Sequence, residues 1–197
     1  RQVRTSVVLP AYNEQHNIEP LVEEILVVFN EHPEYGPVEV IIVDDGSTDG
    51  TCDVIRDLAA AYDEVLGVFL SRNFGQSPAL NAGIERATGE YIVTMDADGQ
   101  NDPADVPQLL EELDDGVGCV SGWRRDRNDP FAKTVPSAIQ TVMARWTGPD
   151  IHDFGCTLKA YQAEALNQMP LYGEGHRYIP AKLYKRGYQI TETPVNH

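Results

Sequence analysis

The chain has 197 residues, of which 42% are hydrophobic, and its formal net charge is −16 at pH 7. This length and hydrophobic content indicate one folded domain with a continuous core and exclude a disordered tail. No stretch approaches the roughly 18 uninterrupted apolar residues of a membrane helix. The acidic balance excludes nucleic acid as a partner, because no basic stripe is present to displace counterions.

The acidic composition has two interpretations. The chain carries 31 Asp and Glu residues against 15 Lys and Arg residues. An ordinary acidic soluble protein has such a balance, and so does a protein from a salt-adapted, halophilic organism, in which acidic surfaces stay hydrated and Lys is scarce. Only four residues are lysines, namely Lys133, Lys159, Lys182 and Lys185.

Three cysteines, Cys52, Cys119 and Cys156, are far apart and odd in number. They form no CxxC pair, so neither a disulfide framework nor a zinc site is indicated. We expect free, buried thiols in a reducing compartment.

The first part of the chain alternates strands and helices. A short β-branched run over residues 5–10 closes with a proline and predicts a buried strand, and residues 17–29 have helical apolar spacing. The continuous apolar run 38–45 is typical of a parallel strand covered on both faces. A helix follows over 47–62, with Ser47, Thr48 and Asp49 expected to cap its start.

The same unit then repeats. Strands are predicted at 64–70, 91–96 and 118–123, and helices at 77–87 and 105–113. Beyond Trp123 the alternation fades into an Arg-, Asp- and Pro-rich loop, a helix near 136–146, two more helical stretches and a last strand at 188–195. We therefore expect an α/β domain with a mostly parallel sheet and helices on both faces.

Polar clusters follow three of these strands: "PAYNE" the first, "DDGSTD" the second and "DADGQND" the fourth. In such sheets ligands bind beyond the carboxyl ends of the strands. These ends locate the expected site.

Asp96 and Asp98 lie one residue apart where a buried strand ends, so their carboxylates can flank one point. Paired hard oxygens suit Mg²⁺ or Mn²⁺ holding phosphate oxygens, because the substrate supplies several of the ligands. The Gln100 carbonyl offers a further ligand. In so acidic a chain such a pair also arises by chance as solvated surface acids, but its place at a strand end favours the metal.

Two other functions of an Asp-x-Asp pair are disfavoured. A calcium loop needs Gly at position six and Glu at twelve, where this chain has Asn101 and Pro107. A haloacid-dehalogenase-type phosphatase places the motif on its first strand and needs a following Thr or Ser, where this chain has Gln100.

The first two clusters offer nucleoside contacts. Tyr12 presents a flat ring for a base, and Glu14 is an acceptor for a base or ribose. Asp44 and Asp45 end the second strand as acceptors for a base N–H or ribose hydroxyls. For Asp45 helix capping competes with ligand binding, and we favour ligand binding.

The ordered motifs "TSVVLPAYNE", "VDDGSTDGT", "SRNFGQSPALNAGI" and "MDADGQNDP" resemble family 2 glycosyltransferases with the GT-A fold. More narrowly, the set resembles dolichyl- or polyprenyl-phosphate hexosyltransferases of the dolichol-phosphate mannose synthase type, from Ser6 to about Val195. The resemblance implies transfer of a hexose from a GDP- or UDP-sugar to a lipid phosphate, with inversion and with Mg²⁺ or Mn²⁺. It implies one catalytic domain, 1–197, with a nucleotide-sugar half, 1–123, and an acceptor half, 124–197.

Carried over by motif, the resemblance implies three groups of donor-side residues. Asp98 and Gln100 would bind the metal, with Asp98 catalytic. Arg72 in "SRNFG" would reach the diphosphate or form a structural salt bridge. The remaining nucleotide-sugar contacts would come from Pro10, Ala11, Tyr12, Glu14, Val43, Asp45, Asp96 and Ala97.

On the acceptor side the resemblance implies basic residues near the phosphates. Arg124 matches a family arginine, although the usual "GSR" stands here as "GWR", which leaves the role of Trp123 open, and Lys133 lies in the loop beyond. "YGEGHRYIP" resembles a segment near the acceptor, with His176 as a base or structural group and Arg177 as a phosphate partner. Asp153 falls where many members carry a catalytic base.

Charge separates two kinds of acceptor. A phosphate monoester has a second pKa of about 6, so its oxygen is anionic at neutral pH. Such a nucleophile needs positive charge to offset its repulsion from the donor diphosphate, and it does not need a strong base. A saccharide hydroxyl needs a base such as Asp153. The lipid phosphate is the favoured acceptor; a saccharide acceptor and a nucleotide-sugar-binding domain without turnover are the alternatives. A dehydrogenase is disfavoured because no GxGxxG follows the first strand.

A lipid acceptor also predicts a location. Relatives of this type continue through a basic stretch into membrane helices, whereas this sequence ends just before that point. We expect the parent protein to be membrane-attached, with this part as a soluble head at the cytoplasmic face of the cell membrane.

Overall fold

The computed structural model describes residues 2–113, 116–124, 151, 153, 155–166 and 179–196. Its helices are α1 (Ile18–Glu31), α2 (Thr51–Ala61), α3 (Gln76–Ile84), α4 (Val106–Glu111), α6 (Ala163–Leu166) and α7 (Ile179–Lys185), with 3₁₀ turns at Pro33–Tyr35 and Pro103–Asp105. Its strands are β1 (Thr5–Ala11), β2 (Val38–Asp44), β3 (Val65–Phe69), β4 (Tyr91–Thr94), β5 (Val117–Arg124), β6 (Lys159–Gln162) and β7 (Gln189–Val195).

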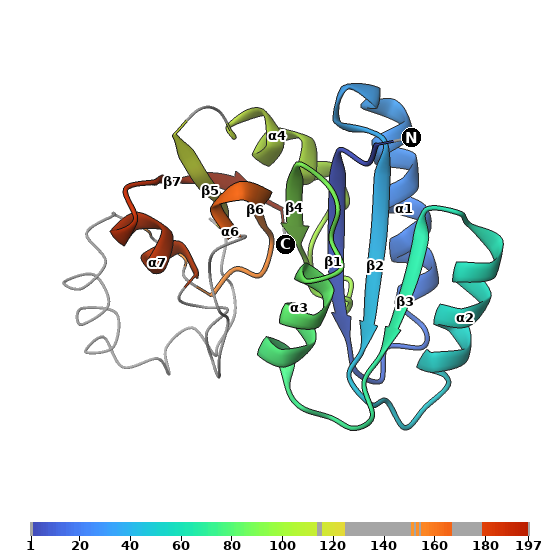
Figure 1. The fold of residues 1–197 in the computed structure, drawn as a ribbon. Helices are drawn as coiled ribbons and strands as arrows, with labels where there is room; N and C mark the ends of the chain where they lie inside the picture. The colour runs from blue at the N-terminus through green and yellow to red at the C-terminus, as the bar shows by residue number, and fades with distance from the viewer. Residues whose placement is uncertain are drawn as a thin grey trace.

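The strands of the described residues form one sheet in the order β3-β2-β1-β4-β6-β5-β7 (Figure 1). β1 runs parallel to β2 and β4, β2 to β3, and β5 to β7. The expected mostly parallel α/β sheet is confirmed. β6 is the exception, because it pairs antiparallel with both β4 and β5, and no strand was predicted there.

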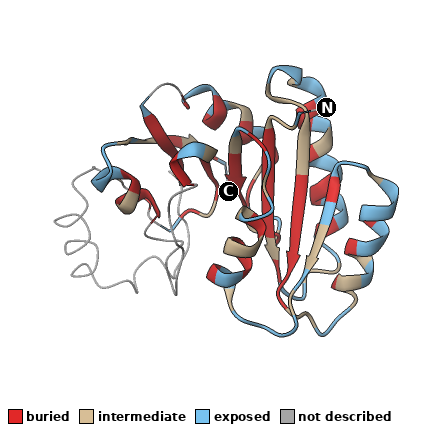
Figure 2. Cartoon of the chain, viewed as in Figure 1, coloured by how far each residue is buried: buried red, intermediate tan, exposed pale blue. Residues whose placement is uncertain are grey.

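Helices cover both faces of this sheet. Side chains of α1, α2 and α4 form one buried cluster with alternate residues of the strands, and side chains of α3, α6 and α7 form a second cluster. Leu9 on β1 and Ile42 on β2 belong to the first cluster, while Val8 and Ile41 belong to the second. The central strands are therefore buried on both faces, as Figure 2 shows, which explains their continuous apolar sequences.

The three cysteines are free, as predicted, and Cys119 and Cys156 are buried, but Cys52 is only partly buried, contrary to the expectation. Burial raises the pKa of the Cys119 thiol to about 12. Burial also raises the pKa of Cys52 to about 11, helped by its hydrogen bond to Asp44. No helix in the described part of the chain has the length and apolar character needed to cross a membrane.

Candidate active site

The loops that follow β1, β2 and β4 meet at one edge of the sheet. This follows from the topology, because β1 lies between β2 and β4 and all three run in the same direction. Together with the loop after β3 and the start of α3 they enclose a cleft of about 280 Å³. The cleft is lined by Pro10, Ala11, Tyr12, Glu14, Asp45, Asn73, Gly75, Gln76, Ala79, Asp96, Ala97 and Asp98.

Most of the predicted donor-side residues are thus brought together. Three of them are absent from this lining. Val43 is fully buried beneath it, in the cluster with α3. Arg72 is exposed, and its guanidinium lies over the Phe74 ring at 4.7 Å from the ring centre. Gln100 is exposed, and its backbone N–H donates to Asp98 Oδ1 at 3.0 Å.

Side chains brace the loop after β1 against the loop after β2. The Asn13 backbone N–H donates to Ser47 Oγ at 2.9 Å, and Asn13 Oδ1 accepts from the Thr48 N–H at 2.8 Å. Asn13 has a φ of 58°, a left-handed conformation that Asn tolerates better than most residues. The expectation that Ser47 caps the next helix is therefore wrong, because its hydroxyl serves the neighbouring loop. Asp49 does accept from the Thr51 N–H at 3.0 Å, where α2 begins.

Asp45 combines a structural contact with its place on the cleft wall. It is 4% exposed, and its two carboxylate oxygens accept from the backbone N–H groups of Phe74 and Gly75 at 2.7 and 2.9 Å. Each oxygen keeps a second lone pair, so these bonds leave acceptor capacity for a ligand. Asp44 is instead turned under the loop, accepting from Ser47 N–H and from the Cys52 thiol.

Gly46 allows these loops to approach each other. Its φ is +70°, and a Cβ added there would lie 2.3 Å from the Arg72 carbonyl carbon. We expect Gly46→Ala to destabilise the fold by at least about 2 kcal/mol, because backbone strain adds to a clash with backbone that cannot move aside. Gly99→Ala is the matched control, since Gly99 also has positive φ (+77°) but nothing within 4 Å. Denaturant unfolding should show the larger loss for Gly46→Ala; equal losses would contradict this packing.

Asp96 and Asp98 both face the cleft, as predicted. Asp96 Oδ1 accepts from Gln76 Nε2 at 2.6 Å, and the Asp96 backbone N–H donates to Asn101 Oδ1 at 3.3 Å. Burial raises the pKa of Asp96, and the charge of Asp98 raises it further, against the lowering effect of the nearby Thr157 hydroxyl and of the Gln76 hydrogen bond. The ionised pair therefore costs folding free energy at neutral pH, and a cation would relieve that cost.

Asp96 and Asp98 suit a divalent cation only if a bound substrate supplies further ligands. The described residues hold no group of three His, Cys, Asp or Glu side chains that would complete a metal site. Mg²⁺ and Mn²⁺ at phosphate sites take one or two carboxylates from the protein and the remaining oxygens from phosphates and water. Asp98 and Asp96 suit that pattern.

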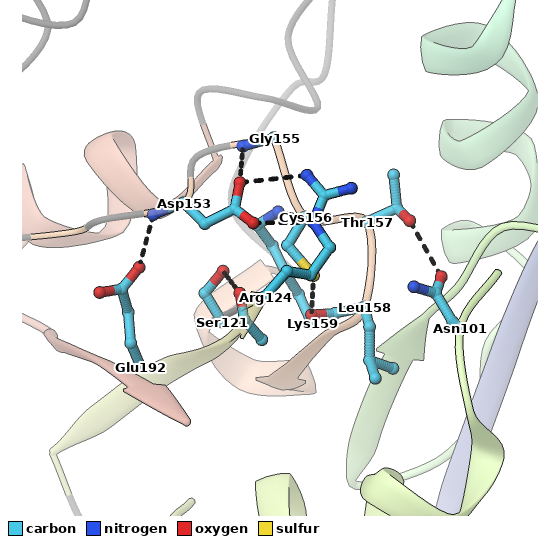
Figure 3. Close-up of polar contacts among 11 residues, drawn as sticks. Asn101, Ser121, Arg124, Asp153, Gly155, Cys156, Thr157, Leu158, Lys159 and Glu192 are labelled. Carbon is cyan, nitrogen blue, oxygen red and sulfur yellow. Dashed lines mark hydrogen bonds and ion pairs between the residues drawn. The ribbon is translucent and has the colours of Figure 1, made fainter. Parts of the chain in front are cut away.

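Arg124 and Asp153 form a buried ion pair (Figure 3). The guanidinium contacts both carboxylate oxygens, Nε to Oδ2 at 2.8 Å and Nη2 to Oδ1 at 3.2 Å, and the side chains are 14% and 6% exposed. Asp153 Oδ1 also accepts from Gly155 N–H, and the Asp153 N–H donates to Glu192 of β7. The carboxylate expected to act as a base is thus engaged in holding the arginine. Lys133, His176 and Arg177 lie outside the described residues.

Sequence reasoning missed four polar residues around Asp96. Gln76 follows the third strand, so the rule that located the other clusters applies to it as well. Asn101 lies in the same loop as Asp98, and its Oδ1 accepts from Thr157 Oγ1 at 3.0 Å. Lys159 begins the unpredicted strand β6 and Thr157 lies just before it, so no signal pointed to them.

Comparisons with known proteins agree with this architecture. The chain is 40% identical over 185 residues to dodecaprenyl-phosphate galacturonate synthase of Rhizobium johnstonii, covering 92% of this chain and 54% of that protein. It is 36% identical over 194 residues to undecaprenyl-phosphate 4-deoxy-4-formamido-L-arabinose transferase of Aeromonas hydrophila, covering 98% and 59%. The chain therefore spans between half and two thirds of the length of these relatives.

Solved structures share the fold. A mannosyltransferase of Pyrobaculum calidifontis, in complex with GDP-Man and Mn²⁺, superimposes with a TM-score of 0.71 at 27% identity, over 98% of this chain and 55% of that one. Glucosyl-3-phosphoglycerate synthase of Mycobacterium tuberculosis gives 0.73 at 24% identity, over 98% and 70%. Residues 6–169 match the family described as Glycosyl transferase family 2. With this match and the GT-A-like sheet, the chain belongs to glycosyl transferase family 2.

Proposed function

We propose that this chain is the catalytic part of a transferase that moves a sugar from a nucleoside diphosphate to a polyprenyl phosphate, with Mg²⁺ or Mn²⁺ at Asp98. The observation that carries the proposal is the cleft at the sheet edge, where Asp96 and Asp98 face Tyr12, Glu14 and Asp45 in a family 2 chain. The names of the relatives support a polyprenyl-phosphate acceptor, and the Mn²⁺ complex of the mannosyltransferase supports the cation.

The donor lies along the cleft with its nucleoside at the β1 and β2 end. Tyr12 is 44% exposed there and offers its ring to the base, while Glu14 and Asp45 offer acceptors to base N–H groups or ribose hydroxyls. The diphosphate lies at Asp96, Ala97 and Asp98. Asp98 and Asp96 would hold a cation there, which would supply positive charge as the nucleoside diphosphate leaves. Pro10 and Ala11 form the floor.

The acceptor side favours an anionic nucleophile over a saccharide hydroxyl. Asp153 is held by Arg124 and by Gly155 N–H, so its carboxylate is poorly placed to take a proton. A phosphate oxygen needs no such base, and its attack needs positive charge nearby. Arg124 supplies that charge from β5, joined by Lys133, Arg177 and His176 on the family resemblance. Residues 1–123 then serve the donor and 124–197 the acceptor, at the cytoplasmic face of a membrane.

The sugar is specified less closely than the acceptor. One relative is named for galacturonate and another for a formamido derivative of the pentose arabinose. A hexose, in the broad sense that includes its uronic acid, is our narrower proposal.

The test is calorimetry of the chain with UDP and GDP, each with and without Mn²⁺. We expect one of the two to bind at least tenfold more tightly with Mn²⁺, because Asp98 would hold a cation whose charge offsets that of the diphosphate. Transfer of labelled sugar to undecaprenyl phosphate in detergent then tests turnover by the full-length protein. A chain that binds neither nucleotide in the presence of Mn²⁺ refutes the proposal.

A further inference from the structure

Lys159 is a lysine in the sheet interior that the proposed reaction has not used. It lies on β6 opposite Thr94 of β4, and it is 5% exposed. Its ammonium donates to the Cys156 carbonyl oxygen. An ammonium has three N–H donors, and the described residues provide no second hydrogen bond and no ion pair within 4 Å for it. Lysine is seldom buried without a partner. The two unused N–H donors of Lys159 therefore indicate that a bound ligand supplies the acceptor.

These donors border a small cavity of about 40 Å³. Thr94 and Asp96 at the end of β4 form one wall, and Thr157 and Lys159 form another. The Thr94 hydroxyl donates to the Thr157 carbonyl and the Thr157 hydroxyl donates to Asn101, so both hydroxyl hydrogens are committed. A buried water needs roughly 10–15 Å³ by this measure, so the space suits a group of two or three non-hydrogen atoms.

The cavity continues the nucleotide-sugar cleft on the side away from the nucleoside. Pro10, Gln76 and Asp96 line both spaces. Tyr12 and Asp45 lie on the β1 and β2 side of Asp96, whereas Lys159 lies on the β6 side. A donor whose diphosphate is at Asp96 and Asp98, as in the proposed function on which this inference rests, directs its sugar toward the cavity.

We propose that this cavity is the subsite for the exocyclic group on C5 of the donor sugar, and that Lys159 donates hydrogen bonds to an oxygen of that group. A carboxylate and a hydroxymethyl group both carry such an acceptor and both have the right size. The carboxylate gains more, because a bond between two charged groups is about twice as strong as a neutral one, and its charge offsets the burial that lowers the pKa of Lys159. Lys159 therefore favours a hexuronic acid over a hexose, and a hexose over a pentose.

Matched donors isolate this contact. UDP-glucuronate, UDP-glucose and UDP-xylose share one ring and differ only at C5, and UDP-galacturonate, UDP-galactose and UDP-L-arabinopyranose form the epimeric series. Dissociation constants with Mn²⁺ are measured by calorimetry for the wild type, Lys159→Met and the control Lys185→Met, which removes an exposed lysine of α7. Each constant is divided by that protein's own constant for UDP, so that a general loss of binding cancels.

In one series or the other we expect the uronate to bind at least about tenfold more tightly than the pentose in the wild type and in Lys185→Met, and no more than about twofold in Lys159→Met. If Lys159→Met does not fold, Lys159→Gln keeps a neutral donor and should lose the preference for uronate over hexose. A wild type that binds all members of both series alike, or a preference that survives loss of the ammonium, overturns the inference.

These outcomes are separate from failure of the proposed function, in which neither UDP nor GDP binds. If GDP is the nucleotide, the matched donors are GDP-mannuronate, GDP-mannose and GDP-6-deoxymannose. The last carries a methyl group without an acceptor on C5 and takes the place of the pentose in the same criteria.

Discussion

Asp98→Ala is expected to abolish cation-assisted binding of the nucleotide and, with it, sugar transfer. Asp98 lies on the cleft wall, and its Oδ1 is held by the Gln100 backbone N–H, so the carboxylate is oriented before a ligand arrives. Replacing residues that merely orient metal ligands lowers metal affinity by about 10- to 100-fold. Loss of a ligand itself should cost at least about 100-fold in the Mn²⁺-dependent part of the affinity.

Calorimetry with and without Mn²⁺ measures this effect, and the stability of the variant excludes a trivial cause. The charge of Asp98 raises the pKa of the partly buried Asp96, which means that the two carboxylates repel each other. Its removal should therefore leave the free energy of unfolding unchanged or slightly higher. Asp57→Ala removes the same charge from an exposed position on α2 and should keep Mn²⁺-assisted binding. If Mn²⁺ still strengthens nucleotide binding in Asp98→Ala, the cation does not bind at Asp98.

The donor side could be predicted because its signals are local. Strands buried on both faces leave continuous apolar sequences, and the polar residues that follow β1, β2 and β4 must meet once those strands are parallel neighbours. The helix that connects each of these strands to the next returns the chain to the same sheet, so the sequence alone predicts that they are parallel neighbours.

The acceptor side depends on contacts between distant segments. β6 has four residues with a buried lysine at its start, so neither a period-two pattern nor an apolar run marks it. Its pairing with β4 joins residues about seventy positions apart, as in Tyr91 and Gln162. The same holds for Asp153, because its role follows from Arg124, 29 residues earlier, and no spacing in the sequence announces that pair. The prediction that Ser47 caps a helix was wrong for a similar reason, since the Ser47 hydroxyl accepts a hydrogen bond from the loop after β1.

The Arg124–Asp153 pair should be the most sensitive of the ion pairs that the described residues form. Arg124→Met removes the guanidinium from a carboxylate that is 6% exposed, and breaking a buried pair from one side costs about 3–5 kcal/mol. Asp153→Asn combined with Arg124→Met should be less damaging than Arg124→Met alone, because the double variant leaves no Asp153 carboxylate buried without the guanidinium. Denaturant unfolding of the two single variants and the double variant completes the cycle.

The exposed pair Arg56–Asp53 is the matched control for that cycle. Its atoms are 3.0 Å apart, a separation close to that of the buried pair, but its side chains are 61% and 82% exposed. Water and salt screen such a pair, so Arg56→Met should leave stability nearly unchanged. A loss in Arg124→Met no larger than in Arg56→Met would mean that burial does not strengthen the Arg124–Asp153 contact. Asp153 would then not be the residue that holds the arginine toward the phosphates, and a proton-accepting role for it would become the better explanation.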